Sequence, residues 1–267
     1  MELEEENIAR LVPKRILSVK FFQSEHMRMV VVGNSHGDLG FWNVDSDNEE
    51  GDGIYKYHPH FAPVSSIVIQ PFSLNKIITS CYDGLVRSLD IEKETFGVTY
   101  TTKHAIFSMS QRCDDVNSLY LGEGNGVVRI WDERSGKLSF SRNLHELRIN
   151  TIDFNSDNLN LMVTSSSDQT ACIWDLRKLG KRKPEPLKLI SHTGTVNSAY
   201  FSPFGSFLAT TSVDNKIGVL SGANYDKVRM IHHKNTPAGI RTSPFNGCCA
   251  SKCPKKRKKA KVSQNVS

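Results

Sequence analysis

The residue types with the clearest capacity for chemistry are a histidine, a hydroxyl, an aspartate and a tryptophan in the middle of the chain. His145 is followed by Thr164, Ser166, Asp168 and Trp174. A buried aspartate in a tight turn needs hydrogen-bond donors, and an imidazole N–H, a hydroxyl and an indole N–H can satisfy one another. We therefore predict a structural hydrogen-bond network of His145, Ser166 (or Thr164), Asp168 and Trp174.

A hydrolase is an alternative because Gly33-Asn34-Ser35-His36-Gly37 fits the G-x-S-x-G pattern of a serine nucleophile. That pattern requires a turn from a strand into a helix, whereas Leu39-Gly40-Phe41-Trp42 reads as a strand. Gly122–Gly126 similarly occupies a turn and lacks the spacing of a phosphate-binding loop. We predict no catalytic residue and no enzyme activity; ester hydrolysis abolished by Ser35→Ala would favour the alternative.

The cysteines indicate neither a disulfide framework nor a metal centre. Cys81, Cys113 and Cys172 are scattered singly through strand-like segments, which is typical of a reducing compartment. Three further cysteines and two histidines near the C-terminus could hold zinc, but their spacing matches no common zinc finger; they are Cys248, Cys249, Cys253, His232 and His233. No metal site and no cofactor are predicted.

The elements that would position these residues are short strands in a repeat. A large residue closes each copy at Trp42, Leu89, Trp131, Trp174 and Leu220, so the copies are 42 to 47 residues apart. A turn residue precedes each end by six positions. This period is typical of four-stranded propeller blades. No helical period of any length interrupts the strands, and the predicted fold class is an all-β propeller with about five blades.

Charge divides the chain into a nearly neutral body and a basic tail. The formal net charge is +6, but after Ala250 the chain holds seven lysines and arginines and no acid. We expect a solvated lead-in at residues 1–14, a propeller at 15–235 and a disordered basic tail at 236–267. The acidic first residues predict no secretory signal, and no apolar run is long enough to span a membrane.

Two groups of motifs resemble known propeller families. Gly53–His60, Pro63-Val64-Ser65 and Tyr82–Arg87 are similar to the WD repeat-containing protein 76 family. Asp168-Gln169-Thr170, Ile173–Arg177 and Val196–Pro203 are similar both to that family and to the small subunit of the damaged-DNA-binding complex. The resemblance implies a nuclear, chromatin-associated, DNA-binding WD-repeat propeller in the DNA-damage response. It also implies seven blades, so five would represent a truncated or alternatively spliced product.

The resemblance also suggests where partners would bind. Arg15 and Arg148, with Lys103 nearby, precede first strands of blades and would bring positive charge to the channel mouth, where DNA phosphates would bind. A DNA-inserting hairpin of the damaged-DNA-binding relative corresponds to Met230–Asn235, so His232, His233 and Lys234 are further candidates. The alternative is a generic scaffold whose channel binds a histone or other peptide without nucleic acid.

Two further segments predict protein partners. Trp174-Asp175-Leu176-Arg177 resembles the box by which WD-repeat substrate receptors dock on the adaptor of a cullin-based ubiquitin ligase, and Arg134 ends a looser copy. An arginine at the rim can instead pair within its own blade. The run Lys255, Lys256, Arg257, Lys258 and Lys259 resembles a nuclear-import signal; the alternative is a solvated run that adds nonspecific affinity for phosphate.

Overall fold

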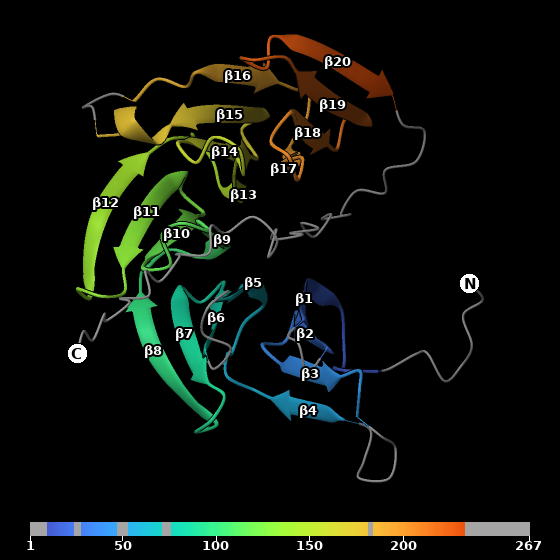
Figure 1. Cartoon of the computed structure of the whole chain (residues 1–267), viewed down its shortest axis with the longest axis vertical. Coiled ribbons are helices and arrows are strands. Elements are labelled where there is room, and N and C mark those ends of the chain that lie inside the picture. The colour runs from blue at the N-terminus through green and yellow to red at the C-terminus, as the bar shows by residue number, and fades with distance from the viewer. Residues whose placement is uncertain (1–9, 24–27, 47–52, 71–75, 181–183, 233–267) are drawn as a thin grey trace, which may run out of the picture.

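The computed structural model describes residues 10–23, 28–46, 53–70, 76–180 and 184–232, and these form five four-stranded antiparallel sheets. In each sheet the strands pair in chain order. The sheets follow one another around an arc, with the first strand of each sheet near the centre and the fourth at the outer rim (Figure 1). The all-β propeller with five blades that the repeat predicts is therefore confirmed.

The strand bounds show that the blades repeat closely. The first two sheets contain β1 (Ile16–Gln23), β2 (Arg28–Asn34), β3 (Leu39–Asn43), β4 (Ile54–Tyr57), β5 (Val64–Ile69), β6 (Lys76–Cys81), β7 (Leu85–Asp90) and β8 (Thr95–Thr101). The third and fourth contain β9 (Ile106–Gln111), β10 (Ser118–Glu123), β11 (Val127–Asp132), β12 (Lys137–Asn143), β13 (Ile149–Phe154), β14 (Leu161–Ser166), β15 (Thr170–Asp175) and β16 (Lys188–Ser191). The fifth contains β17 (Val196–Phe201), β18 (Phe207–Ser212), β19 (Lys216–Ser221) and β20 (Lys227–His232).

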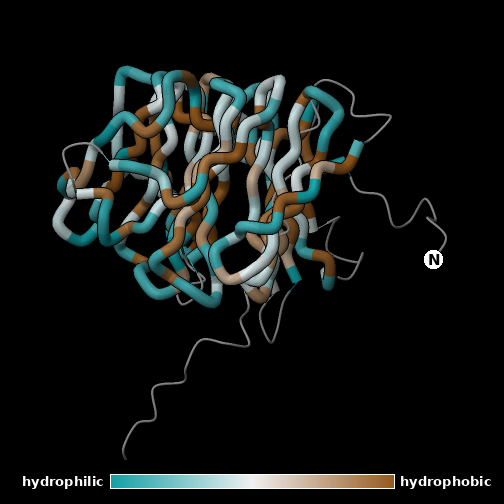
Figure 2. The backbone as a smooth tube through the Cα atoms, turned by 90° about the horizontal axis from the view of Figure 1, so that it is seen from above, coloured by the Kyte–Doolittle hydropathy of each residue, from teal (hydrophilic) through white to brown (hydrophobic). Residues whose placement is uncertain are grey.

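Apolar layers join each sheet to the next. Side chains alternate between the two faces of a strand, so each sheet presents one set to the preceding sheet and the other to the following one. Between the fourth and fifth sheets, for example, Val163 and Ile173 pack with Leu208 and Leu220. Hydrophilic turns close the strands at both ends, whereas apolar segments occupy the strand interiors (Figure 2).

The end of the lead-in differs from the solvated segment that the sequence predicts. Leu11 and Val12 are buried, at 6% and 5% exposure, and pack against Val32 of the first sheet. Gly40 makes room for them, because a Cβ atom there would lie 2.9 Å from Cγ1 of Val12. The expectation was wrong for these residues, since two apolar side chains suffice to hold the segment on an otherwise open sheet face; residues 1–9 lie outside the described part.

The fifth sheet has one face that no described sheet covers. In the fourth sheet, Leu161 and Ile190 contribute to the layer shared with the fifth sheet. The corresponding residues of the fifth sheet, Phe207 and Ile231, are 51% and 42% exposed. Within the described ranges, no helix has the length and apolar character needed to cross a membrane; η2 (Leu176–Lys178) is a single 3-10 turn.

Candidate functional site

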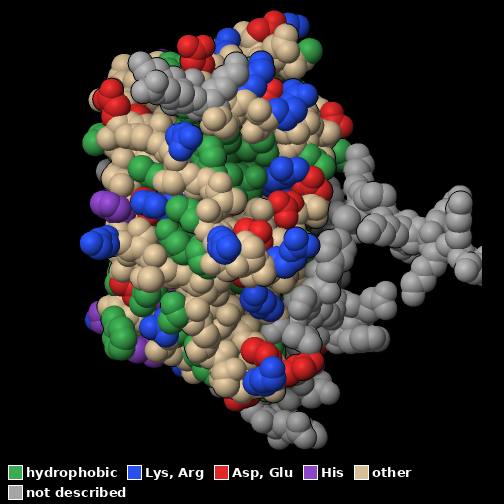
Figure 3. Space-filling view, turned by 90° about the vertical axis from the view of Figure 1, so that its left-hand side faces the viewer, with side chains coloured by type: hydrophobic (Ala, Val, Ile, Leu, Met, Phe, Trp, Pro, Cys, Tyr) green, Lys and Arg blue, Asp and Glu red, His purple; other side chains and the backbone are tan. Residues whose placement is uncertain are grey.

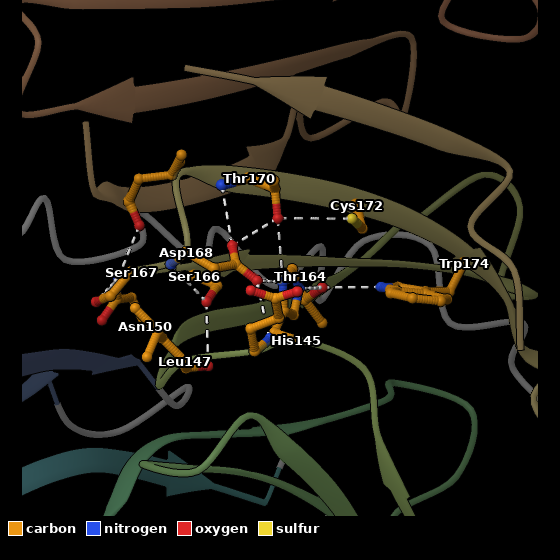
Figure 4. Close-up of polar contacts among 12 residues, drawn as sticks. His145, Leu147, Asn150, Thr164, Ser166, Ser167, Asp168, Thr170, Cys172 and Trp174 are labelled. Atoms are coloured by element: carbon orange, nitrogen blue, oxygen red, sulfur yellow. Dashed lines mark hydrogen bonds and ion pairs between the residues drawn. The ribbon is translucent and has the colours of Figure 1, made fainter. Parts of the chain in front are cut away.

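The fourth sheet contains a linear hydrogen-bond network (Figure 4). The indole N–H of Trp174 donates to Oγ1 of Thr164 at 2.8 Å, and that oxygen lies 2.6 Å from Nε2 of His145. Nδ1 of His145 lies 2.8 Å from Oδ2 of Asp168. Because Nδ1 of His145 faces the Asp168 carboxylate, the ring proton lies on Nδ1, and Nε2 accepts from the Thr164 hydroxyl, whose oxygen accepts from the indole.

The environment of Asp168 keeps its carboxylate ionised. Burial opposes ionisation, but hydrogen bonds from His145 and Thr170 outweigh it and lower the pKa of Asp168 well below its usual range. Ser166 does not link the histidine to the tryptophan, although the sequence was compatible with that role. Its hydroxyl donates to the carbonyl of Leu147 at 3.1 Å and accepts from the backbone N–H of Asp168, so it fixes the turn while Thr164 links the two rings.

The other sheets carry reduced or altered versions of this network. In the fifth sheet, Nε2 of His192 lies 3.0 Å from Oγ1 of Thr210, but Leu220 stands where the fourth sheet has tryptophan. In the third sheet a buried carboxylate replaces the network: Oε1 of Glu123 accepts from Nε of Arg129 at 2.7 Å. Sequence reasoning missed that pair because neither residue type fits the repeated pattern.

Arg15 and Arg148 line one cavity of about 340 Å³. Arg15 precedes the first sheet and Arg148 precedes the fourth, so residues far apart in the sequence converge on one hollow at the strand entrances. The remaining lining residues come from the first, second and fifth sheets: Leu17, Tyr82, Thr195, Asn197 and Val213. Lys103 is exposed and lies outside this lining set.

Two aromatic side chains, Phe107 and Tyr82, lie next to Arg148 in sequence of contact. Nε of Arg148 donates to Oγ of Ser167 at 2.8 Å, and its guanidinium lies 5.0 Å from the ring centroid of Phe107. The Phe107 and Tyr82 rings are 4.5 Å apart. A cation beside two neighbouring aromatic rings can bind a negative group together with a flat one. Sequence reasoning did not select Tyr82 or Phe107; their signal is an aromatic directly beside a blade turn.

The remaining nucleic-acid candidates lie elsewhere. His232 is exposed at the end of β20, the outermost strand of the fifth sheet, where it pairs with Lys216 of β19. It does not line the cavity. His233 and Lys234 lie outside the described residues. So do the basic residues predicted for nuclear import, namely Lys255, Lys256, Arg257, Lys258 and Lys259.

The adaptor-docking candidates separate into buried and exposed groups. Trp174 and Asp175 are 3% and 4% exposed, so their side chains cannot contact a partner while the blade is intact. The expectation that these two side chains contact the adaptor is therefore corrected: Trp174 is hydrogen-bonded within the blade network, and Asp175 is hydrogen-bonded to Arg177. Arg177 donates to Asp175 from Nε at 2.9 Å and from a terminal nitrogen at 2.8 Å, yet remains 67% exposed. Arg134 is exposed after β11.

The segment with the serine-nucleophile pattern forms a turn between strands. Ser35 lies between β2 and β3, and its backbone N–H donates to the carbonyl of Arg15 at 2.9 Å. The chain continues into a strand and not into a helix. The local geometry therefore differs from the elbow that this kind of nucleophile requires.

Comparison with known proteins agrees with the blade geometry. The family model "WD domain, G-beta repeat" matches residues 136–175 and 184–219. WD repeat-containing protein 76 of Xenopus laevis is 30% identical over 228 residues, which cover 84% of this chain and 39% of the relative. DNA damage-binding protein cmr1 of Aspergillus oryzae is 27% identical over 239 residues, covering 81% of this chain and 45% of the relative.

The chain spans less than half of the length of these curated relatives. The segment aligned with these relatives nevertheless covers most of this chain, and the two family-model matches extend from β12 of the third sheet to β19 of the fifth. This chain carries WD40 repeats and is homologous to WD repeat-containing protein 76 and to the DNA damage-binding protein CMR1.

Proposed function

We propose that this chain is a non-enzymatic WD-repeat protein of the DNA-damage response that binds DNA or chromatin at the cavity lined by Arg15 and Arg148. The observation that carries the proposal is the convergence of these two arginines with Tyr82 on a single hollow. Phosphates are bound through such cations, and the aromatic neighbours suit an unstacked base. The names of the relatives, several of which are called DNA damage-binding proteins, support the same class of ligand.

The distribution of charge supports this choice of surface. The outer wall presents lysines and arginines interspersed with acids and apolar side chains (Figure 3). Such a mixed surface attracts a polyanion weakly, because neighbouring opposite charges cancel. In contrast, the lining of the cavity contains two arginines and no acidic residue.

The test measures the affinity of labelled duplex DNA by fluorescence anisotropy at several salt concentrations. All variants carry glutamine in place of the seven lysines and arginines after Ala250, so that the tail cannot supply the affinity; they are Lys252, Lys255, Lys256, Arg257, Lys258, Lys259 and Lys261. We expect Arg148→Ala to weaken binding and to reduce the slope of log K against log salt by about 1. Arg134→Ala is the matched control, because it removes an exposed arginine away from the cavity. Unchanged binding by Arg148→Ala and Arg15→Ala would refute the site.

A peptide-binding scaffold is the alternative function. The same arginines would then bind an acidic peptide such as a modified histone segment, and the chain would bind no DNA once the tail is neutralised. Competition between duplex DNA and an acidic peptide distinguishes the two, because only the DNA-binding proposal requires the duplex to bind by itself.

We also propose that the exposed Arg177 docks on a ubiquitin-ligase adaptor. Two bonds that it donates to the Asp175 carboxylate hold its guanidinium in one orientation at the rim while leaving most of it accessible. A preorganised arginine of this kind suits paired bonds to a carboxylate or to carbonyls of a partner. Co-purification of the adaptor with the wild-type chain, and its loss with Arg177→Ala, is expected; equal recovery with both would refute docking.

The tail supports a nuclear location. Replacement of Lys255 to Lys259 by glutamine is expected to move a fluorescent fusion from the nucleus to the cytoplasm, since import receptors bind a run of cations. A fusion that stays nuclear would contradict the role.

A further inference from the structure

Three of the five sheets carry a histidine before the first strand and an aspartate in the turn between the second and third strands, and in one of them the residue beside this pair differs in chemistry. In each of the three, the last residue of the second strand lies beside this pair. The equivalent triplets are His145, Ser166 and Asp168 in the fourth sheet, His192, Ser212 and Asp214 in the fifth, and His60, Cys81 and Asp83 in the second. The second sheet alone has a thiol where the other two have a hydroxyl.

The histidine and the carboxylate are farthest apart where the cysteine occurs. Nδ1 lies 2.8 Å from the carboxylate in the fourth sheet, 3.4 Å in the fifth and 4.0 Å in the second. In the fourth sheet Oγ1 of Thr170 also lies 3.2 Å from Nδ1 of His145, whereas the second sheet has Leu85 at that position and no hydroxyl. The second sheet therefore lacks the polar contacts to Nδ1 that close the network in the fourth sheet.

His60 is consequently left with a buried nitrogen that makes no hydrogen bond. Its side chain is fully buried, Nε2 lies 2.8 Å from Oγ1 of Thr79, and Nδ1 has no partner. Nδ1 of His192 also lacks a hydrogen bond, but it faces a closer carboxylate and no thiol. Native structures rarely leave a buried ring nitrogen unsatisfied, and binding of an ion is one of the ordinary reasons for such a nitrogen.

We propose that Nδ1 of His60, Sγ of Cys81 and a carboxylate oxygen of Asp83 form a zinc-binding site in the second sheet. These three atoms lie within 4.8 Å of one another. Ligand atoms at about 2.0–2.3 Å from a tetrahedral zinc are about 3.3–3.8 Å apart, so closure requires movements of about 1 Å or less. Asp83 follows Cys81 in the turn and is 21% exposed, which leaves the fourth position to water.

The ligand types select zinc over harder cations. A thiolate and an imidazole favour zinc, whereas magnesium and calcium prefer oxygen ligands throughout. Burial, and to a lesser degree Arg87, lowers the pKa of His60 to about 4, so its ring is neutral and ready to coordinate at neutral pH. Burial raises the pKa of Cys81 to about 12. Zinc must therefore displace the thiol proton to solvent, giving a zinc–thiolate bond and one released proton.

Besides the raised pKa of the Cys81 thiol, two features weaken zinc binding at this site. The Cys81 thiol donates to the carbonyl of Ala62 at 2.9 Å, and that bond is lost when the thiolate turns to the metal. The positive charge of Arg87 lies near enough to act on His60. The thiolate and the Asp83 carboxylate together supply two negative charges against it, so the site remains favourable for a divalent ion.

The test uses cobalt as a spectroscopic substitute for zinc. The chain is purified with chelator, with serine in place of Cys113, Cys248, Cys249 and Cys253, so that Cys81 and Cys172 are the two thiols that remain. One equivalent of Co²⁺ is expected to produce a thiolate-to-cobalt charge-transfer band and tetrahedral visible bands, and one equivalent of Zn²⁺ is expected to abolish them.

Two serine substitutions make a matched pair. Cys81→Ser restores the residue type of the fourth and fifth sheets and should fold, but it is expected to abolish the band and to weaken zinc binding at least about tenfold. Cys172→Ser removes the other buried thiol and is expected to leave both unchanged. Asp83→Asn keeps the acceptor for the backbone N–H of Leu85 but removes the charge, and is expected to weaken binding. Absence of the band, its survival in Cys81→Ser, or equal loss in Cys172→Ser would overturn the proposal.

Discussion

Replacing Thr164 by valine tests the linear network most directly. The change keeps the shape of the side chain but removes the hydroxyl that joins Trp174 to His145. Both rings are buried, so the indole N–H and Nε2 would each lose their partner with no water to replace it. An orphaned buried group costs about 1–3 kcal/mol, and two of them should lower the free energy of unfolding by about 2–6 kcal/mol.

Thr210→Val in the fifth sheet is the matched control. There the equivalent hydroxyl contacts His192 alone, because Leu220 replaces the tryptophan. We expect a loss of about 1–3 kcal/mol, close to half of the Thr164 effect. Urea unfolding at neutral pH, followed by circular dichroism, gives both values, and amide hydrogen exchange assigns the weakened sheet. Equal losses in the two variants, or less than about 1 kcal/mol for Thr164→Val, would refute the assignment of two partners to this hydroxyl.

Three further predictions concern charge, backbone and surface. The pKa of Asp168 is lowered in the folded state, so the stability that its carboxylate contributes is present above about pH 4 and is lost as the pH falls. The difference in urea midpoint between the wild type and Asp168→Asn should therefore become smaller on acidification. Gly126→Ala should destabilise far more than the roughly 1 kcal/mol expected for Gly136→Ala. Both glycines have positive φ, but a Cβ atom at Gly126 would lie 1.9 Å from the carbonyl oxygen of His145, whereas nothing lies within 4 Å at Gly136; equal thermal shifts would contradict this. Phe207→Asp should change the melting temperature little and reduce self-association in sedimentation, because the ring is exposed on a sheet face that no described sheet covers.

The inner three strands of each blade were predictable from the sequence, and the fourth was not. Buried strands alternate or concentrate apolar residues, as Lys76–Cys81 and Leu161–Ser166 do. The outermost strands have little burial on either face; every residue of Lys227–His232 is exposed. A strand that buries almost nothing leaves no hydrophobic pattern to detect, so only its pairing with a neighbour defines it.

The sequence by itself determined the repeat, the number of blades and the residue types of the network, because each depends on spacings within about 45 residues. It could not decide which hydroxyl joins the rings: Thr164 and Ser166 differ by two positions and point the same way, and only the pairing of β14 with β15 places Thr164 beside the indole. The tertiary structure alone brought Arg15, Tyr82 and Arg148 to one cavity. It also separated His60 from Asp83 while keeping Cys81 beside them. Contacts between blades depend on how whole sheets pack around an axis, which no local spacing encodes.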